Sequence, residues 1–202
     1  MKKNNIIISS TCVPLPVENI DTDQIIPARF LKAITREGFG ENLFRDWRFD
    51  AEDNLKKNFV LNNTKYKGEI LIAGRNFGCG SSREHAAWAL SDYGFKAVFS
   101  SFFADIFKNN ALINHLLPVI VSEKFLQKLF RTIENDPKAK VAIDIEKQTI
   151  RIEKTGEEEK FPMDPYRKMC FLKGYDDVDY LLSLKSQVLT FEKARKNDYS
   201  IV

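Results

Sequence analysis

The sequence Glu69-Ile-Leu-Ile-Ala-Gly-Arg-Asn-Phe-Gly-Cys-Gly-Ser-Ser-Arg-Glu-His-Ala-Ala-Trp-Ala-Leu90 decides the fold of this chain. Residues 69–73 form a short, largely apolar run that predicts a strand buried on both faces, and residues 86–90 predict a helix. Glycines between them permit backbone conformations that are closed to other residues. Ser81, with Glu84 three positions later, matches the pattern of a helix capping box. The stretch therefore predicts a strand, a glycine-rich loop and a helix N-terminus.

Such a junction suits an anion. A helix N-terminus offers unpaired N–H groups and the positive end of the helix dipole. Here the hydroxyls of Ser81 and Ser82 and the guanidinium of Arg83 add further donors. No Lys stands where a nucleotide-binding P-loop needs one, and Ser81 does not lie in a G-x-S-x-G elbow. The alternative is that Ser81 only caps a helix, Arg83 is solvated and the glycines only make a tight turn, but three glycines, two serines and an arginine within ten residues favour a binding site. We therefore expect the loop to bind a carboxylate or a phosphate.

The octapeptide Gly78-Cys-Gly-Ser-Ser-Arg-Glu-His85, followed by Ala-Ala-Trp-Ala-Leu90, resembles the small subunits of 3-isopropylmalate dehydratase. These subunits are the swivelling domain of the aconitase superfamily. The resemblance extends to four further blocks in the family's order, at residues 19–27, 92–96, 101–107 and 116–118. It therefore covers nearly the whole chain.

The resemblance implies an α/β fold with one swivelling-type β/β/α domain over residues 1–202. Its core would be a mixed or barrel-like sheet, with a parallel βαβ portion flanked by helices, a β-hairpin and C-terminal helices. The hydrophobic pattern places further strands at 6–16, 96–99 and 118–121, helices at 102–110 and after Ser122, and a hairpin at 140–153. Alternating strands and helices predict parallel pairing.

The remaining segments are expected to hold loops and short helices. Residues 156–159 are expected to form a solvated loop, and short helices are expected at 164–172, 176–184 and 187–196, with Tyr180 and the leucines that follow it in the core. Residues 27–66 lack clear periodicity and are expected to be irregular and mobile. Their many aromatic rings argue against disorder, and they fit a local core or a docking surface equally well.

The resemblance also implies a function. The chain would be the small subunit of a hydro-lyase that interconverts 2-isopropylmalate and 3-isopropylmalate by dehydration and rehydration in leucine biosynthesis. A [4Fe-4S] cluster is expected on the large-subunit partner, and no cofactor is expected on this chain. Ser81 matches the family's catalytic serine base, and Ser82 and Arg83 match residues that bind substrate carboxylate.

Other residues would assist these three. Asp23, in the motif Asp-Thr-Asp, would position the serine–arginine loop, although Asp residues are also common caps and turn formers. Gly80 and His85 are expected to support the loop, with His85 satisfied by local hydrogen bonds. Leu31 and Lys32 correspond to the segment that faces the variable side chain of the substrate.

The composition of the chain argues against a nucleic-acid partner, a membrane span and a metal site. The net charge is +3 and the basic residues are distributed without a stripe, so we expect no nucleic-acid partner. No apolar run approaches the length of a membrane span. Three cysteines without a C-x-x-C motif predict a reducing cytoplasm and cannot supply a four-thiolate cluster, and two histidines make a zinc site improbable. We therefore expect no metal site in this chain.

The residues alone leave two other functions open. One is the small subunit of a related hydratase that acts on another di- or tricarboxylate. The other is a non-enzymatic module that binds a carboxylate in the same loop. A pure anion binder needs no base, so the presence of both serines together with Asp23 favours an enzyme.

Overall fold

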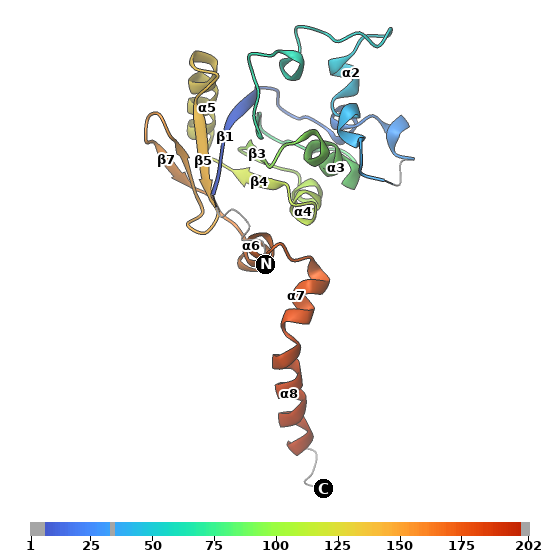
Figure 1. The fold of residues 1–202 in the computed structure, drawn as a ribbon, viewed down its shortest axis with the longest axis vertical. Coiled ribbons are helices and arrows are strands. Elements are labelled where there is room, and N and C mark those ends of the chain that lie inside the picture. Colours follow the sequence, from blue (N-terminus) through green and yellow to red (C-terminus); the bar gives the residue numbers. More distant parts are fainter. Residues whose placement is uncertain (1–6, 33–34, 199–202) are drawn as a thin grey trace.

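A seven-stranded mixed sheet forms the centre of the molecule in the computed structural model, which describes residues 7–32 and 35–198 (Figure 1). The strands are β1 Ile7–Leu15, β2 Ile70–Ala73, β3 Ala97–Ser100, β4 Leu117–Ile120, β5 Lys140–Asp144, β6 Thr149–Ile152 and β7 Glu158–Lys160. They lie in the order β4-β3-β2-β1-β5-β6-β7. Neighbours among β1 to β4 are parallel, and β1, β5, β6 and β7 pair antiparallel. The predicted mixed sheet with a parallel portion and a hairpin is confirmed.

Successive residues of the parallel strands enter two hydrophobic cores. Ile70 and Ile72 of β2 belong to one buried cluster, and Leu71 and Ala73 to the other, because neighbouring side chains on a strand point to opposite faces. Helix α5 (Glu123–Asn135) covers the first face, and helices α3 (Glu84–Tyr93) and α4 (Asp105–Ile113) cover the second (Figure 1). Burial on both faces explains why β2 is an uninterrupted apolar run.

Helix α5 begins as predicted at Ser122, whose Oγ accepts a hydrogen bond from the Phe125 N–H at 3.2 Å. The backbone N–H of Ser122 in turn donates to a carboxylate oxygen of Glu159 at 2.6 Å. Glu159 lies on β7 and pairs with Ile150 of β6. The expectation of a solvated loop at 156–159 is therefore wrong for its end, because a third antiparallel strand takes up the backbone there.

The segment 27–66 is irregular, as predicted. With the turn before it, its described residues hold only short elements: α1 Thr22–Ile25, η1 Ala28–Phe30, η2 Phe39–Asn42, α2 Arg45–Arg48 and η3 Val60–Asn62. Phe39 and Phe44 are buried in the core cluster below α3, and Phe44 stacks on Trp47 with ring centroids 5.5 Å apart. These rings thus form local core. The expected mobility of the segment stays a prediction, and residues 33 and 34 lie outside the described residues.

Three helices end the chain, close to the predicted positions: α6 Pro165–Lys173, α7 Asp177–Ser183 and α8 Lys185–Asp198. Helices α7 and α8 run away from the sheet as a tail (Figure 1). The expectation that this region is core is wrong for Leu181 and Leu182, which are 65% and 64% exposed, because the tail packs little of its apolar surface on the body. None of the described helices has the length and apolar character needed to cross a bilayer.

Candidate active site

Two loops meet at one end of the parallel strands. Loop 17–23 follows β1 and loop 74–81 follows β2, and because these strands are parallel neighbours, the loops leave the sheet at the same edge. Backbone hydrogen bonds of 2.8–3.1 Å join them at four points: Gly74 N to Val17 O, Asn19 N to Arg75 O, Gly78 N to Ile20 O, and Thr22 N to Cys79 O. The loop that the sequence singled out is therefore held along its length by a segment about sixty residues earlier.

The glycines are required by the close packing of this loop. Gly78 has φ +75°, and a Cβ there would lie 2.2 Å from Cγ of Phe107 on α4. Gly80 has φ +90°, and a Cβ there would meet the side chain of Asp21 at 3.2 Å. Both positions combine left-handed backbone with a near neighbour, so a side chain at either would cost free energy twice.

Ser81 and Ser82 are exposed at the outer end of the loop. The carbonyl oxygen of Ser81 accepts a hydrogen bond from Oγ1 of Thr22 at 2.9 Å, and Thr22 is almost fully buried. The prediction that Ser81 caps the helix is wrong: α3 begins at Glu84, and the cap residue is Arg83, whose side chain makes no capping hydrogen bond. The backbone of Ser81 is held instead by Thr22, which leaves the Ser81 hydroxyl outside the helix end.

Arg83 forms an ion pair with Asp23 through its Nη1 atom. The arginine side chain is only 16% exposed, and that of Asp23 is 54% exposed. The other acid of the motif, Asp21, caps α1: its carboxylate accepts from the Gln24 N–H at 2.8 Å, and its own N–H donates to the Gln24 side chain at 2.9 Å. The structure thus separates the two acids, with Asp21 a local cap and Asp23 directed to the loop.

Glu84 fixes the start of α3 to the end of α4. Its Oε1 accepts from Nδ2 of Asn114 at 3.0 Å and from Nε1 of Trp88 at 3.1 Å, and it lies 3.5 Å from Nη2 of Arg36. The hydrogen bond from Asn114, followed by that from Trp88 and the charge of Arg36, lowers the pKa of Glu84 below its ordinary value. The carboxylate is therefore an anchor rather than a proton carrier near neutral pH.

His85 and Cys79 lie on either side of the serines. The His85 ring packs against the rings of Trp88 and Phe39, at centroid distances of 4.4 and 5.5 Å. Burial, and then the charge of Asp21, raise the pKa of the Cys79 thiol, whose Sγ donates to the carbonyl oxygen of Asn19. A raised pKa disfavours the thiolate, so Cys79 lacks the character of a nucleophile.

Residues 28–32, the segment expected to face the variable side chain of the substrate, begin at η1. Leu31 ends this short helix and packs, half-buried, against the core cluster that also holds Ala86 of α3, whereas Lys32 is exposed. The neighbouring Arg29 is paired with Asp46 and lies over the ring of Phe30, 4.8 Å from its centroid. Of the two cations in this segment, Arg29 is thus paired, whereas Lys32 forms no ion pair with any described residue.

The aconitase C-terminal domain, a known protein family, matches residues 3–124. The chain is 59% identical over 196 residues to the 3-isopropylmalate dehydratase small subunit of Christiangramia forsetii, covering 97% of this chain and 96% of that protein. It is 57% identical to the small subunit of Azobacteroides pseudotrichonymphae, covering 93% and 96%. The chain belongs to the family of 3-isopropylmalate dehydratase small subunits.

A solved structure agrees with this membership. The crystal structure of 3-isopropylmalate dehydratase from Methanocaldococcus jannaschii superposes with a TM-score of 0.63 at 28% identity, covering 93% of this chain and 99% of that one. The relatives are named small subunits, and this name implies a large-subunit partner. The predicted recognition and fold are therefore confirmed.

The thiols of this dehydratase small subunit do not fit an iron–sulfur cluster. Cys12 and Cys170 are buried and Cys79 is half-buried, and they lie on β1, on α6 and in loop 74–81, which we call the serine loop. Burial raises the pKa of the Cys12 thiol far above its ordinary value, whereas a cluster needs thiolates. Within residues 7–32 and 35–198, no three His, Cys, Asp or Glu side chains group as metal ligands.

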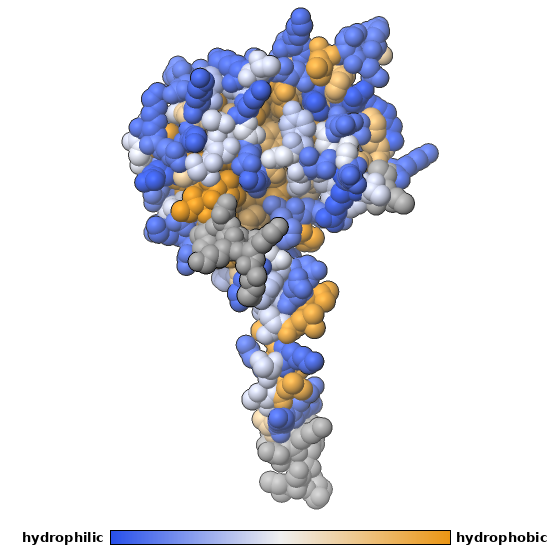
Figure 2. Space-filling model, in the orientation of Figure 1, coloured by the Kyte–Doolittle hydropathy of each residue, from blue (hydrophilic) through white to orange (hydrophobic). Residues whose placement is uncertain are grey.

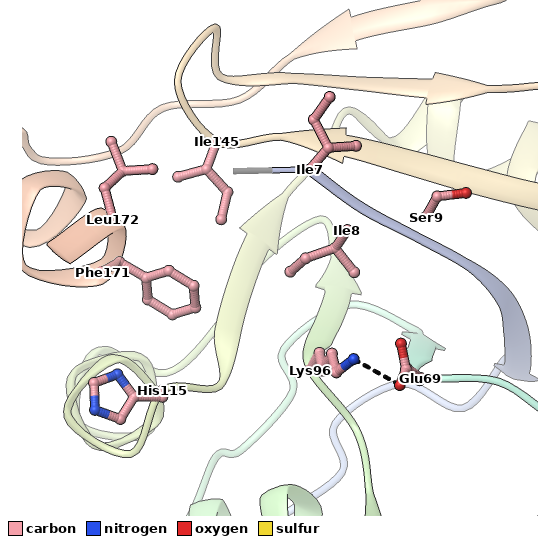
Figure 3. Close-up of a pocket in the computed structure, with 9 residues that line it drawn as sticks. All are labelled: Ile7, Ile8, Ser9, Glu69, Lys96, His115, Ile145, Phe171 and Leu172. Carbon is pink, nitrogen blue, oxygen red and sulfur yellow. Dashed lines mark ion pairs between the residues drawn. The ribbon is translucent and has the colours of Figure 1, made fainter. Parts of the chain in front are cut away.

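A pocket of about 620 Å³ lies at the opposite end of the sheet (Figure 3). Its lining is mixed, with five apolar residues among nine, and the pair between Lys96 Nζ and Glu69 Oε1, 2.7 Å apart, lies at one side. Glu69 precedes β2 and Lys96 precedes β3, whereas the serine loop follows β2. The candidate active site is therefore not this cavity but an open edge of the molecule.

Proposed function

We propose that the edge carrying Ser81, Ser82 and Arg83 is one half of an active site that is shared with a large subunit. At this site 2-isopropylmalate and 3-isopropylmalate would be interconverted by loss and re-addition of water. One observation supports this placement above the others. Two loops that are hydrogen-bonded along their length bring Ser81 and Arg83 to one exposed edge. There Thr22 holds the backbone of Ser81, and Asp23 pairs with Arg83. A surface loop with no chemical task would not need such support.

In this reaction Ser81 would be the base that removes a proton from the substrate. A carbon next to a carboxylate gives up a proton, the electron pair left behind forms the carbon–carbon double bond, and the neighbouring C–O bond breaks. Ser81, as its alkoxide, would take that proton on Oγ and return it on rehydration. A free serine hydroxyl is too weak an acid to ionise near neutral pH, so the alkoxide needs positive charge and N–H donors around it. Arg83, two residues away, is the cation that this loop supplies.

Carboxylate binding would fall to Ser82 and Arg83. A guanidinium carries five N–H donors in a planar fork, so its pair with Asp23 leaves donors for a substrate carboxylate. Asp23 would hold the fork in a fixed orientation before substrate binds. Because Arg83 is largely buried and Ser82 exposed, the substrate would approach from the solvent side of the loop.

The second half of the site is assigned to the large subunit. A [4Fe-4S] cluster there would act as a Lewis acid toward the hydroxyl that leaves. The thiols of this chain do not suit a cluster, and its serine edge is open to solvent, as a surface that meets another subunit must be. We place the reaction in the cytoplasm, where free cysteines stay reduced.

Reconstitution tests the whole proposal. The purified chain alone is expected to be colourless and inactive, and activity on isopropylmalate is expected when it is mixed anaerobically with the cluster-loaded large subunit from the same genome. Stoichiometric iron and sulfide in the chain alone would contradict the cluster assignment. A complex that forms but turns over no hydroxy-acid would favour a non-enzymatic carboxylate-binding module, and turnover of another di- or tricarboxylate alone would favour a related hydratase.

A pair of variants tests the residue roles. Ser81→Ala is expected to lower kcat by about 10²–10⁴-fold, the usual contribution of a positioned base. Its stability should change by no more than about 0.5 kcal/mol, since the side chain is exposed and caps nothing. The neighbouring Ser82→Ala is the matched control and should raise KM more than it lowers kcat. Near-normal kcat in Ser81→Ala would require another base.

A further inference from the structure

Large apolar side chains are exposed along one part of the molecule. They lie on α4 and the turn before it, on α7 and on α8, and each exposes about half or more of its surface: Phe102, Ile106, Ile113, Val178, Leu181, Leu182, Val188, Leu189 and Phe191. We call this set the apolar track. Figure 2 shows its hydrophobic patches along the tail. Patches of this extent are uncommon on proteins that act alone and mark interaction surfaces.

The track follows helical faces. Ile106 and Ile113 are seven residues apart, two turns of α4, while Phe107 and Ala111 of the same helix are buried against the sheet. On α7, Val178 and Leu182 are one turn apart, with Leu181 beside them. Helix α4 is thus apolar on its inner side and carries an exposed isoleucine at each end of its outer side, with Asn109 and Asn110 between them.

One end of the track adjoins the serine loop. The carbonyl oxygen of Phe102 accepts a hydrogen bond from the Phe77 N–H at 3.1 Å, and the carbonyl oxygen of Phe77 accepts from the Ala104 N–H at 3.2 Å. Phe77 lies in the serine loop, immediately before Gly78. The exposed ring of Phe102 therefore belongs to the segment that holds this loop in place.

The other end continues into the tail. Ile113, at the end of α4, and Val178, at the start of α7, line one pocket of about 240 Å³. In Figure 1 the tail leaves the body near α4. The track thus runs from the serine loop, along α4, and out onto α7 and α8.

We propose that the apolar track is the docking surface for the large, cluster-bearing subunit, which would present a complementary apolar groove to α4 and grip the tail. This inference rests on the proposed function: a partner that completes the active site at Ser81 must cover the adjoining Phe102 and Ile106. A swivelling subunit that is attached at one open edge also gains a second anchor through a projecting tail.

A second copy of this chain fits the track less well. A copy seated on Phe102 and Ile106 would cover the serine loop with a surface that holds no cluster. Antiparallel pairing of two tails would need the acids at the start of α7, but these are already engaged. Asp176 and Asp179 form the capping box of α7, and Asp177 pairs with Arg167 and accepts from Tyr166. These carboxylates therefore already have partners within their own chain.

Three serine variants of the full chain test the docking. Ile106→Ser and Leu181→Ser each remove an exposed apolar side chain from the track, and Leu55→Ser is the matched control, because Leu55 is as exposed as Ile106 but lies in the 49–55 turn. Each chain is titrated into a fixed amount of the cluster-loaded large subunit. The dissociation constant is read from activity and, independently, from sedimentation.

We expect each track variant to raise Kd at least tenfold, equivalent to about 1.4 kcal/mol, and the double variant to raise it further. The limiting rate at saturating large subunit should stay that of the wild type, and Leu55→Ser should leave Kd unchanged. The proposal is overturned if both track variants bind within twofold of the wild type, or if Leu55→Ser weakens binding equally.

Sedimentation separates this proposal from the proposed function. If the wild-type chain binds the large subunit without turnover, the function fails while the effect of Ile106→Ser on Kd still decides the docking surface. Self-association of the chain alone that Leu181→Ser abolishes, with unchanged affinity for the large subunit, would assign the tail to a second copy and overturn the proposal.

Discussion

Thr22 donates a hydrogen bond from Oγ1 to the carbonyl oxygen of Ser81 across 2.9 Å. The two residues are 59 positions apart in the sequence, and the bond fixes the backbone of the proposed base from a buried position on α1. The backbone of Ser81 is therefore held by a residue of α1 rather than by the helix that follows it.

Thr22→Val should lower kcat more than it raises KM. Valine keeps the shape of threonine and removes only the hydroxyl, so the substitution should cost about 0.5–1.5 kcal/mol of stability, the net worth of one hydrogen bond. A displaced base loses far more, and we expect kcat to fall about tenfold to a hundredfold. Thr22→Ser retains the hydroxyl and should restore most of kcat. If Thr22→Val and Thr22→Ser have the same kcat, the hydrogen bond does not position Ser81.

Arg83→Lys should raise KM and lower kcat. Lysine keeps the positive charge but presents it as a point, so it cannot meet Asp23 and a substrate carboxylate through one planar fork. Arg45→Lys is the matched control, because Arg45 is similarly shielded, pairs with the exposed Asp53 at 2.5 Å and lies away from the serine loop. Its kinetics should match the wild type. Equal kinetics for Arg83→Lys and the wild type would mean that only a diffuse positive field is required.

Gly78→Ala should destabilise the protein by at least about 2 kcal/mol, because it adds a clash with Phe107 to the penalty of left-handed backbone. Gly38 separates the two effects. It has nearly the same φ, +74°, but a Cβ there would meet none of the described residues within 4 Å, so Gly38→Ala should cost only about 1–2 kcal/mol. Unfolding by denaturant measures both. A smaller loss at Gly78 than at Gly38 would show that the loop can move away from α4.

The sequence was sufficient for the sheet because its parallel strands are short apolar runs between helices, and that alternation admits few topologies. It was insufficient at Ser81, where the spacing to Glu84 satisfied a local capping rule. The structure has Thr22, from a distant segment, at the Ser81 carbonyl oxygen, and Glu84 bonded to Asn114 at the end of α4. Local patterns cannot show which distant partner a polar group will choose.

The expectation that Leu181 and Leu182 lie in the core was wrong for a different physical reason. Apolar residues at helical spacing predict a buried face but do not identify the surface that buries it. The same limit applies to the serine edge. The residue types in loop 74–81 pointed to an anion site, and the family resemblance pointed to Asp23, but local pattern alone could not distinguish Asp23, which pairs with Arg83, from Asp21, which caps α1.

Glu84→Gln should reduce stability at neutral pH but not in acid. The hydrogen bond from Asn114 lowers the pKa of Glu84 in the folded state, so its charge contributes stability above the ordinary value of 4.5, and this contribution is lost as pH falls through the lowered pKa. Glutamine can still accept from Asn114 and Trp88 but does not titrate. The difference in Tm between wild type and variant should therefore be largest near pH 7 and vanish in strong acid. A difference independent of pH would mean that the carboxylate charge contributes nothing.

Leu31 tests what sets the choice of substrate. The serine loop can hold carboxylates common to related substrates, so discrimination needs a residue that meets the group that varies. An isopropyl group gains about 0.8 kcal/mol per buried CH₂ from apolar contact, whereas a further carboxylate needs a cation. Arg29 is engaged with Asp46, and Leu31 offers apolar surface beside the exposed Lys32. Leu31 therefore suits an isopropyl group, whereas Lys32 is the cation of this segment that could meet a further carboxylate.

Leu31→Arg should therefore lower kcat/KM for isopropylmalate more than for a smaller or more highly charged hydroxy-acid. Leu31→Met, which keeps apolar surface and nearly the same volume, should leave the ranking of substrates unchanged. The measurement is kcat/KM of the reconstituted complex for each acid at saturating large subunit, so that altered docking does not enter the comparison. The same ranking for Leu31→Arg as for the wild type would assign specificity to the large subunit and leave residues 28–32 as a cover for the site.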